Sequence, residues 1–166
     1  MKIKCIYIIA VFSVVQFSNA QQSLSKLLKK YNTKHIPYIS VEALSSQINQ
    51  SILLDAREFS EYHVSHIKNA IYVGYDHFKM DSIQSRITDK NKKIVVYCSL
   101  GIRSEIVAEK LKKAGFTNVY NLYGGIFEWK NNDFPIYNSE EKKTENIHAF
   151  SKEWGKWLKK GVKIYD

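Results

Sequence analysis

The run KIVVY, at residues 93–97, is apolar and rich in β-branched residues, and it ends abruptly at Cys98. Such a run is typical of a strand that is buried on both faces of a sheet. Short apolar runs of the same kind occur at residues 36–39, 52–54, 70–73 and 119–122. Because helical patterns separate several of these strands, the sequence predicts an α/β fold with three layers, a central parallel sheet flanked by helices.

Local signals predict where the helices lie. Ser40 is a typical N-cap residue and predicts a helix through residues 41–48. Apolar residues at helical spacing predict two further helices over residues 76–87 and 102–114, and Gly115 is placed to end the second of them. We therefore expect a helix to begin directly after the loop that contains Cys98.

Composition excludes several classes of protein. The 166 residues fit one domain of ordinary size, and 45% of them are hydrophobic, which is too many for a disordered chain. No apolar run reaches the about 18–20 residues that a membrane span needs, which excludes a polytopic membrane protein. With only Cys5 and Cys98, the chain is not a disulfide scaffold. The net charge of +9 is spread along the chain and indicates little by itself.

The first twenty residues have the pattern of a signal peptide. Lys2 and Lys4 precede an apolar stretch from Cys5 to Phe17, and small residues follow as far as Ala20. We expect cleavage near Ala20 and export to the periplasm or the medium; a buried N-terminal helix or an uncleaved anchor are the alternatives. The expected organisation is a signal peptide (1–20), an N-terminal flank (21–35), a domain (36–137) and a C-terminal extension (138–166). Within the flank, residues 23–31 suit either a short basic helix or a loosely held segment.

The residue types from Cys98 to Ser104 point to chemistry at the end of the KIVVY strand. Sites in open α/β sheets form at the carboxyl ends of strands, and a tight loop there aims main-chain N–H groups and a helix N-terminus inward. Gly101 supplies the backbone freedom of such a loop, and Arg103 adds a charge that either binds an oxyanion or clamps the loop. These groups should lower the pKa of the Cys98 thiol and favour the nucleophilic thiolate. The alternative is a buried, inert cysteine.

Four motifs in order make the chain resemble the rhodanese-like family of sulfurtransferases, from about Ile36 to Ile136. They are LLDAREFSEY (53–62), HIKNA (66–70), CSLGIRS (98–104) and LYGGIFEW (122–129) with a later proline. The resemblance implies that Cys98 takes a sulfane sulfur from a donor such as thiosulfate, carries it as a persulfide, and passes it to cyanide or to a thiol. The acceptor could be a thioredoxin-like protein, and neither a cofactor nor a metal is implied.

The resemblance also implies roles for residues around Cys98. The persulfide would be stabilised by loop residues, namely Ser99, Leu100, Gly101, Ile102 and Arg103. Support for the loop would come from Asp55, Arg57, Glu61 and Ser104, with Asp55 alternatively a simple turn cap. Glu61 replaces an arginine that contacts the donor in some thiosulfate-using relatives, and it could hold the loop open by accepting hydrogen bonds from loop N–H groups.

Two alternatives to sulfur transfer stay open within this resemblance. Phosphatases and some arsenate reductases share the fold, but their loop has five residues between the cysteine and the arginine, whereas four separate Cys98 from Arg103. The second alternative is a binding module that lacks catalysis. His63 and His66 could suggest a metal pair, but the sequence offers no further ligand set, so we expect no metal.

Beyond the resemblance, apolar residues recur at helical spacing among lysines, at Ile147, Phe150, Trp154, Trp157 and Leu158. This pattern predicts a basic amphipathic helix over residues 147–160. Three roles are open for it: packing on the domain, contact with a membrane surface, or docking of a partner. We expect no nucleic-acid partner, because the chain should be exported and shows no basic groove with interleaved aromatic residues.

Overall fold

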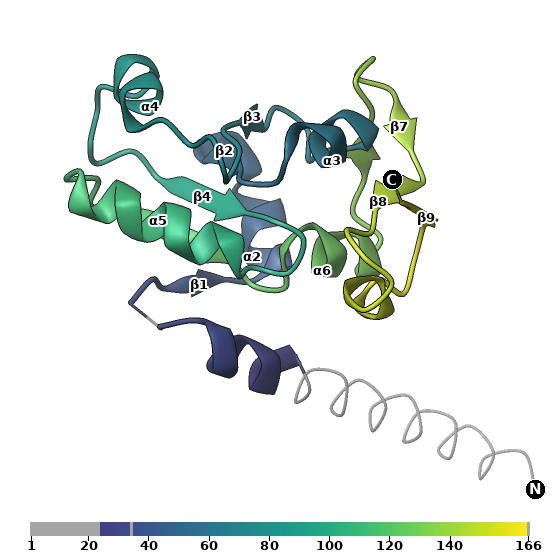
Figure 1. Cartoon of the computed structure of the whole chain (residues 1–166). Coiled ribbons are helices and arrows are strands. Elements are labelled where there is room, and N and C mark those ends of the chain that lie inside the picture. Colours follow the sequence, from purple (N-terminus) through teal and green to yellow (C-terminus); the bar gives the residue numbers. More distant parts are fainter. Residues whose placement is uncertain (1–23, 34, 166) are drawn as a thin grey trace, which may run out of the picture. The chain divides into compact units, whose positions relative to one another are not determined.

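The computed structural model describes residues 24–33 and 35–165, which form two compact units (Figure 1). The first unit, Met1–Thr33, contains a helix over residues 24–31, one of the two alternatives that its basic sequence left open. The expected signal peptide, residues 1–20, lies outside the described residues. The second unit, Lys34–Asp166, contains the sheet and the site described below.

A five-stranded parallel sheet forms the centre of the second unit, with strand order β1-β5-β4-β2-β3. The KIVVY run forms β4, which lies between β2 and β5 and is buried along its whole length. The strands are β1 (Tyr38–Ile39), β2 (Ile52–Asp55), β3 (Ile71–Tyr72), β4 (Ile94–Tyr97) and β5 (Val119–Leu122). Each predicted strand is therefore present, although β1 and β3 are shorter than their apolar runs.

Helices cover both faces of this sheet, which confirms the predicted three-layer α/β fold (Figure 1). On one face, Ile94 and Val96 of β4 pack with Ile83 of α4 and with Val107 and Leu111 of α5 in the main hydrophobic core. Helices α2 and α6 lie on the opposite side of the sheet (Figure 1). The helices are α2 (Val41–Ser46), α3 (Phe59–Val64), α4 (Met80–Arg86), α5 (Arg103–Lys113) and α6 (Gly125–Asn131), and a 3-10 turn (Ile48–Gln50) follows α2.

Local sequence explains where these helices begin and end. The Ser40 side chain accepts a hydrogen bond from the N–H of Ala43 at 3.2 Å and caps α2. Gly115 has a φ of +91°, the left-handed conformation that commonly ends a helix. Helix α4 begins at Met80, four residues later than its apolar pattern predicts, because Asp76 and His77 form a turn and residues 78–79 have no regular structure.

The predicted helix over residues 147–160 is wrong. Residues Asn146–His148 form strand β8, which pairs in parallel with β9 (Val162–Ile164), and a 3-10 turn (Trp154–Trp157) lies between them. The helical spacing suggested the wrong structure because these apolar residues do not share one face. Ile147 and Leu158 are buried, whereas Phe150 is half exposed and its backbone is in the left-handed conformation. Pairing with β9 satisfies backbone groups that a helix would have satisfied internally.

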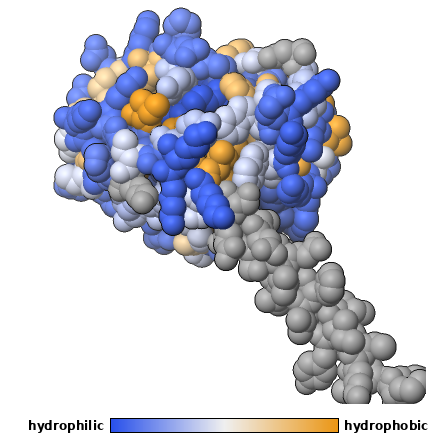
Figure 2. Space-filling model, turned by 60° about the horizontal axis from the view of Figure 1, so that its bottom comes forward, coloured by the Kyte–Doolittle hydropathy of each residue, from blue (hydrophilic) through white to orange (hydrophobic). Residues whose placement is uncertain are grey.

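The segment before β8 is also more ordered than its charged sequence suggests. Strand β7 (Lys143–Thr144) pairs antiparallel with β6 (Ile136–Tyr137). Figure 2 shows a mostly hydrophilic face on which apolar residues lie in small separate patches. Within the described residues, no helix is long and apolar enough to cross a membrane.

Candidate active site

Cys98 lies directly after β4, and α5 begins five residues later at Arg103. The side chain is free and buried, with 2% of the residue exposed. Its Sγ accepts a hydrogen bond from the N–H of Gly101 at 3.1 Å, and the hydroxyl of Ser104 lies 3.5 Å from it. The strand-to-helix junction thus places a sulfur atom against main-chain and hydroxyl donors, as the sequence predicts.

The Cys98 thiol is more acidic than an ordinary cysteine. Burial raises its pKa, but the charge of Arg103 and the hydrogen bonds from Ser104 and Gly101 lower it by more, so the pKa lies below its usual value. The thiolate is the nucleophilic form of cysteine. An inert cysteine would be expected to show the opposite shift, because burial alone disfavours the charged form.

Arg103 clamps the loop. Its Nη1 and Nη2 donate to the two carboxylate oxygens of Glu61 at 2.6 and 2.8 Å, and Nη2 also donates to the Ser99 hydroxyl at 3.1 Å. Ser99 in turn donates to Glu61 at 3.0 Å. Of the two predicted roles for Arg103, the structure favours the clamp, since its guanidinium faces a carboxylate.

Glu61 supports the loop through side chains and not through loop N–H groups. Its carboxylate accepts from Arg103, from Ser99 and from the main-chain N–H of Glu58, which lies in α3's own N-terminal turn. Burial raises the pKa of Glu61, but the hydrogen bonds and the charge of Arg103 together lower it by more. The pKa therefore lies below its usual value, and the carboxyl group is ionised. A buried carboxylate paired in this way fixes the arginine beside Cys98.

Asp55 and Arg57 form a second, fully buried pair. Arg57 donates through Nη2 and Nε to the Asp55 carboxylate at 2.6 and 3.0 Å, and its main-chain N–H donates to the same group at 3.0 Å. Asp55 is therefore both a turn cap and an ion-pair partner. Arg57 also donates to the carbonyl oxygen of Ser65 at 2.6 Å, and its guanidinium lies 5.8 Å from the Tyr97 ring. The pair ties the end of β2 to the segments around the loop.

Asn121 is a supporting residue that the sequence analysis missed. It is fully buried on β5, beside the loop, where its amide nitrogen donates to the carbonyl oxygen of Gly101 at 2.8 Å and to Glu105 at 3.0 Å. Its amide oxygen accepts from the Ser104 hydroxyl at 2.7 Å. Because that hydroxyl has one hydrogen, it donates either to Asn121 or to Cys98. A polar residue inside the apolar strand VYNL was the signal that could have identified it.

The N-terminus of α6 donates main-chain hydrogen bonds to the loop that contains Cys98. The N–H of Ile126 donates to the carbonyl oxygen of Cys98 at 2.9 Å, and that of Phe127 to the carbonyl oxygen of Ser99 at 3.2 Å. This approach requires Gly125, because a Cβ atom there would lie 2.2 Å from the Cys98 carbonyl oxygen.

A pocket of about 140 Å³ opens over Cys98. Leu100 and Ile102 make its loop side apolar, and Phe150 and Trp154 complete it from the C-terminal segment. It is lined by Cys98, Ser99, Leu100, Ile102, Arg103, Phe150 and Trp154. All the predicted loop residues except Gly101 therefore line one cavity.

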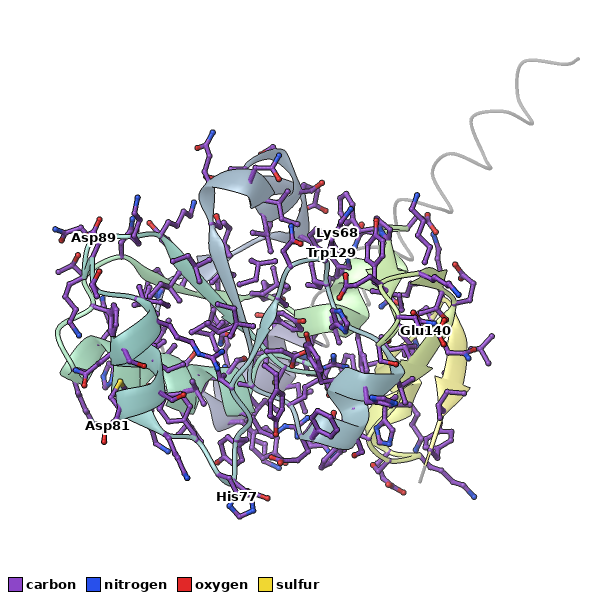
Figure 3. All side chains as sticks on the ribbon, turned by 90° about the horizontal axis from the view of Figure 1, so that it is seen from above. Lys68, His77, Asp81, Asp89, Trp129 and Glu140 are labelled. Atoms are coloured by element: carbon purple, nitrogen blue, oxygen red, sulfur yellow. The ribbon has the colours of Figure 1, made fainter. Side chains whose placement is uncertain are left out.

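The described residues contain no group of three or more His, Cys, Asp or Glu side chains that could hold a metal ion. His66 instead stacks on Tyr62, with a ring distance of 4.2 Å, and contacts Glu141 at 3.1 Å through Nε2. Figure 3 shows His77 and Asp81 pointing outward from the edge of the molecule.

Residues 40–132 match the model of the rhodanese-like domain, which is more than half of the chain. The chain belongs to the rhodanese-like domain family. A rhodanese-related protein of Thermoplasma volcanium is similar in structure, with a TM-score of 0.53 and 28% identity over 60% of this chain and 96% of that one. A thiosulfate sulfurtransferase of Pseudomonas aeruginosa is also similar in structure, with a TM-score of 0.60 and 20% identity. The match covers 84% of this chain and 26% of that one, and at this identity it shows the fold alone.

Curated relatives of this rhodanese-like chain carry a different name. It is 35% identical over 117 residues to a tRNA uridine(34) hydroxylase of Hamiltonella defensa, and 42% identical over 81 residues to one of Aster yellows witches'-broom phytoplasma. These matches cover 64% and 47% of this chain but 33% and 26% of the relatives, so the chain spans a third or less of their length.

These relatives correct the function expected from the sequence. Transfer of a sulfane sulfur through a Cys98 persulfide and the classification of the chain as a sulfurtransferase are wrong, because relatives at 35–42% identity are named for tRNA modification. The signal peptide over residues 1–20 and export to the periplasm or the medium stay predictions. The comparisons support an enzyme of the rhodanese-like family. The sequence motifs pointed to the right family, but they lie in the loop and the core, which do not identify the substrate.

Proposed function

We propose that the protein is a cysteine-dependent enzyme that modifies uridine in tRNA, with the Cys98 thiolate as its reacting group. The observation that carries the proposal is the acidic Cys98 thiol at the floor of a small pocket with an apolar and aromatic lining. The name of the relatives supplies the substrate, and because the chain spans a third or less of their length, the substrate is part of the proposal.

The pocket suits a nucleobase better than a small dianion. Arg103 is the cation nearest the sulfur, and its guanidinium is engaged by Glu61 and Ser99. Leu100, Ile102 and the two aromatic residues offer apolar surface, which a flat base can contact with its faces. An enzyme that acts on a base must draw it out of its stack into such a pocket.

Hydroxylation replaces a ring C–H by C–OH and removes two electrons from the base, so the reaction takes an oxidant besides the chain. With a peroxide, one peroxide oxygen becomes the hydroxyl oxygen and the other leaves as water. With dioxygen, a reductant of the thiol class must also supply two electrons, so that the second oxygen atom leaves as water. We assign to Cys98 the role of reacting group at the base. Ser104 and Gly101 stabilise its thiolate form, since both donate toward Sγ.

The test compares the full chain with its Cys98→Ser variant on tRNA that lacks the modification, in air and with added peroxide. Digested nucleosides are measured by mass spectrometry, and we expect one added oxygen atom on uridine 34 with the unaltered chain only. Asp81→Asn is a matched control, because Asp81 points outward at the edge of the molecule (Figure 3). Equal turnover by Cys98→Ser, or unmodified tRNA alongside sulfur transfer from thiosulfate to cyanide, would contradict the proposal.

A further inference from the structure

Phe150 has a backbone conformation that its side chain disfavours. Its φ is +64°, in the left-handed region, where a bulky residue is an outlier. The residue is also 46% exposed, so its ring contributes less burial than a core phenylalanine. A strained residue that the core does not need is commonly found at a functional site.

Two contacts hold Phe150 in this position. Its main-chain N–H donates to Nδ1 of the buried His148 at 3.2 Å. Its ring lies over the Arg103 guanidinium, 4.7 Å from the ring centroid to Cζ. Since Glu61 clamps Arg103, the ring is positioned by the same network that supports Cys98.

Trp154 reaches the pocket from the 3-10 turn that it begins. Its main-chain N–H donates to the Ser151 hydroxyl at 3.3 Å. Gly155 lies close to the residue that follows β9: a Cβ there would lie 2.6 Å from the Tyr165 hydroxyl. Phe150 and Trp154, which we call the aromatic mouth, both line the Cys98 pocket and both lie beyond residues 40–132 that match the family.

The segment that carries the aromatic mouth is basic. Residues 147–165 contain five lysines and one glutamate, and Lys152 and Lys156, which flank Trp154 in sequence, are exposed. Aromatic side chains among lysines are the usual means of binding single-stranded nucleic acid, since the rings stack on bases and the lysines attract phosphates. The sequence analysis did not recognise this pattern because it treated the aromatic residues as one face of a helix.

We propose that the aromatic mouth determines specificity: Phe150 and Trp154 bind the faces of a pyrimidine base at the entrance of the Cys98 pocket, and Lys152 and Lys156 attract its phosphates. This inference rests on the proposed function and names the part of the chain that would recognise its substrate. The family's matched residues supply the reacting sulfur, and the C-terminal segment supplies the selection of a nucleotide.

The test measures binding, which is independent of turnover. The Cys98→Ser chain is titrated with uridine 5′-monophosphate and with ribose 5-phosphate, followed by tryptophan fluorescence and NMR. We expect uridine 5′-monophosphate to bind more tightly than the sugar phosphate, and Phe150→Ala and Trp154→Ala each to weaken it about tenfold. Phe150→Tyr keeps the ring and should restore binding.

Phe59→Ala is the matched control, because Phe59 is 60% exposed and does not line the pocket. Thermal unfolding checks that each variant is folded, and Trp154→Ala alone carries the test if Phe150→Ala is unfolded. Equal affinity for the nucleotide and the sugar phosphate, or unchanged affinity in folded Phe150→Ala and Trp154→Ala, would overturn the inference. Selective binding without tRNA hydroxylation would contradict the proposed function and leave the inference standing.

Discussion

Arg103 and Glu61 face each other across the active-site loop and join it to α3 through two parallel hydrogen bonds of 2.6 and 2.8 Å. They are 42 residues apart in the chain. The pair fixes a positive charge next to Cys98, where it lowers the pKa of the thiol, and places the same guanidinium under the ring of Phe150. One arginine thus connects the reacting sulfur, its supporting helix and the aromatic mouth.

Arg103→Ala should raise the pKa of Cys98 and destabilise the fold. The variant loses the charge that favours the thiolate and leaves the Glu61 carboxylate buried without its partner, which typically costs about 3–5 kcal/mol. The rate of Cys98 alkylation by iodoacetamide as a function of pH measures the first effect, and urea unfolding the second. Arg103→Lys keeps the charge and should shift the pKa less. An unchanged alkylation profile in folded Arg103→Ala would refute the electrostatic role.

Cys98 ionisation should make stability depend on pH. Its pKa is lower in the folded chain than its ordinary value of 9.0, so over the interval between these two values the unfolded chain binds more protons. Stability therefore rises with pH through this interval, levels off above about 9, and is lost as pH falls through the folded pKa. The free energy of unfolding should be measured from pH 5 to about 10 for the unaltered chain and for Cys98→Ser. The difference between the two should rise with pH as described; a difference that is constant over this range would contradict the prediction.

Asn121→Leu should destabilise the protein by about 1–3 kcal/mol per polar partner left unsatisfied and free the Ser104 hydroxyl to donate to Cys98, which favours the thiolate. The substitution leaves the carbonyl group of Gly101 and the Ser104 hydroxyl without the amide that contacts both. Unfolding in urea and alkylation rates measure these effects. Asn118→Leu is the control, because Asn118 is half-buried, donates to the carbonyl oxygen of Asn91 at 3.3 Å and lies outside the pocket. Similar losses in both variants would show that Asn121 has no particular role.

Gly125→Ala should be far more damaging than Gly115→Ala. Both glycines have positive φ, so both variants bear a backbone cost of about 1–2 kcal/mol. At Gly115 the new methyl group meets nothing within 4 Å, whereas at Gly125 it would lie 2.2 Å from the Cys98 carbonyl oxygen. We expect Gly125→Ala to displace the loop and abolish rapid Cys98 alkylation. Equal melting temperatures for the two variants would contradict this account.

The cellular location provides an independent check, because cleavage near Ala20 followed by export would separate the chain from tRNA. The proposed function requires the chain to lie in the compartment that contains tRNA. Cell fractionation and intact mass spectrometry of the chain from its own host decide between export and a location in the compartment that contains tRNA. A mature chain that begins at Gln21 and lies outside the cytoplasm would overturn the proposed substrate, while the geometry around Cys98 would stand.

The sequence alone determined the five strands of the central sheet, helices α2, α4 and α5, and the position of the reactive cysteine. KIVVY, Cys98 and the helical pattern after Gly101 lie next to one another in the chain, so neighbouring residues suffice to predict a strand, a tight loop and a helix N-terminus. Only the tertiary structure decided what surrounds the sulfur. Glu61 and Asn121 reach the loop from other elements, and Phe150 comes from a segment whose spacing suggested a helix but whose backbone pairs with β9. Such contacts depend on which distant segments the fold brings together, and local periodicity carries no information about them.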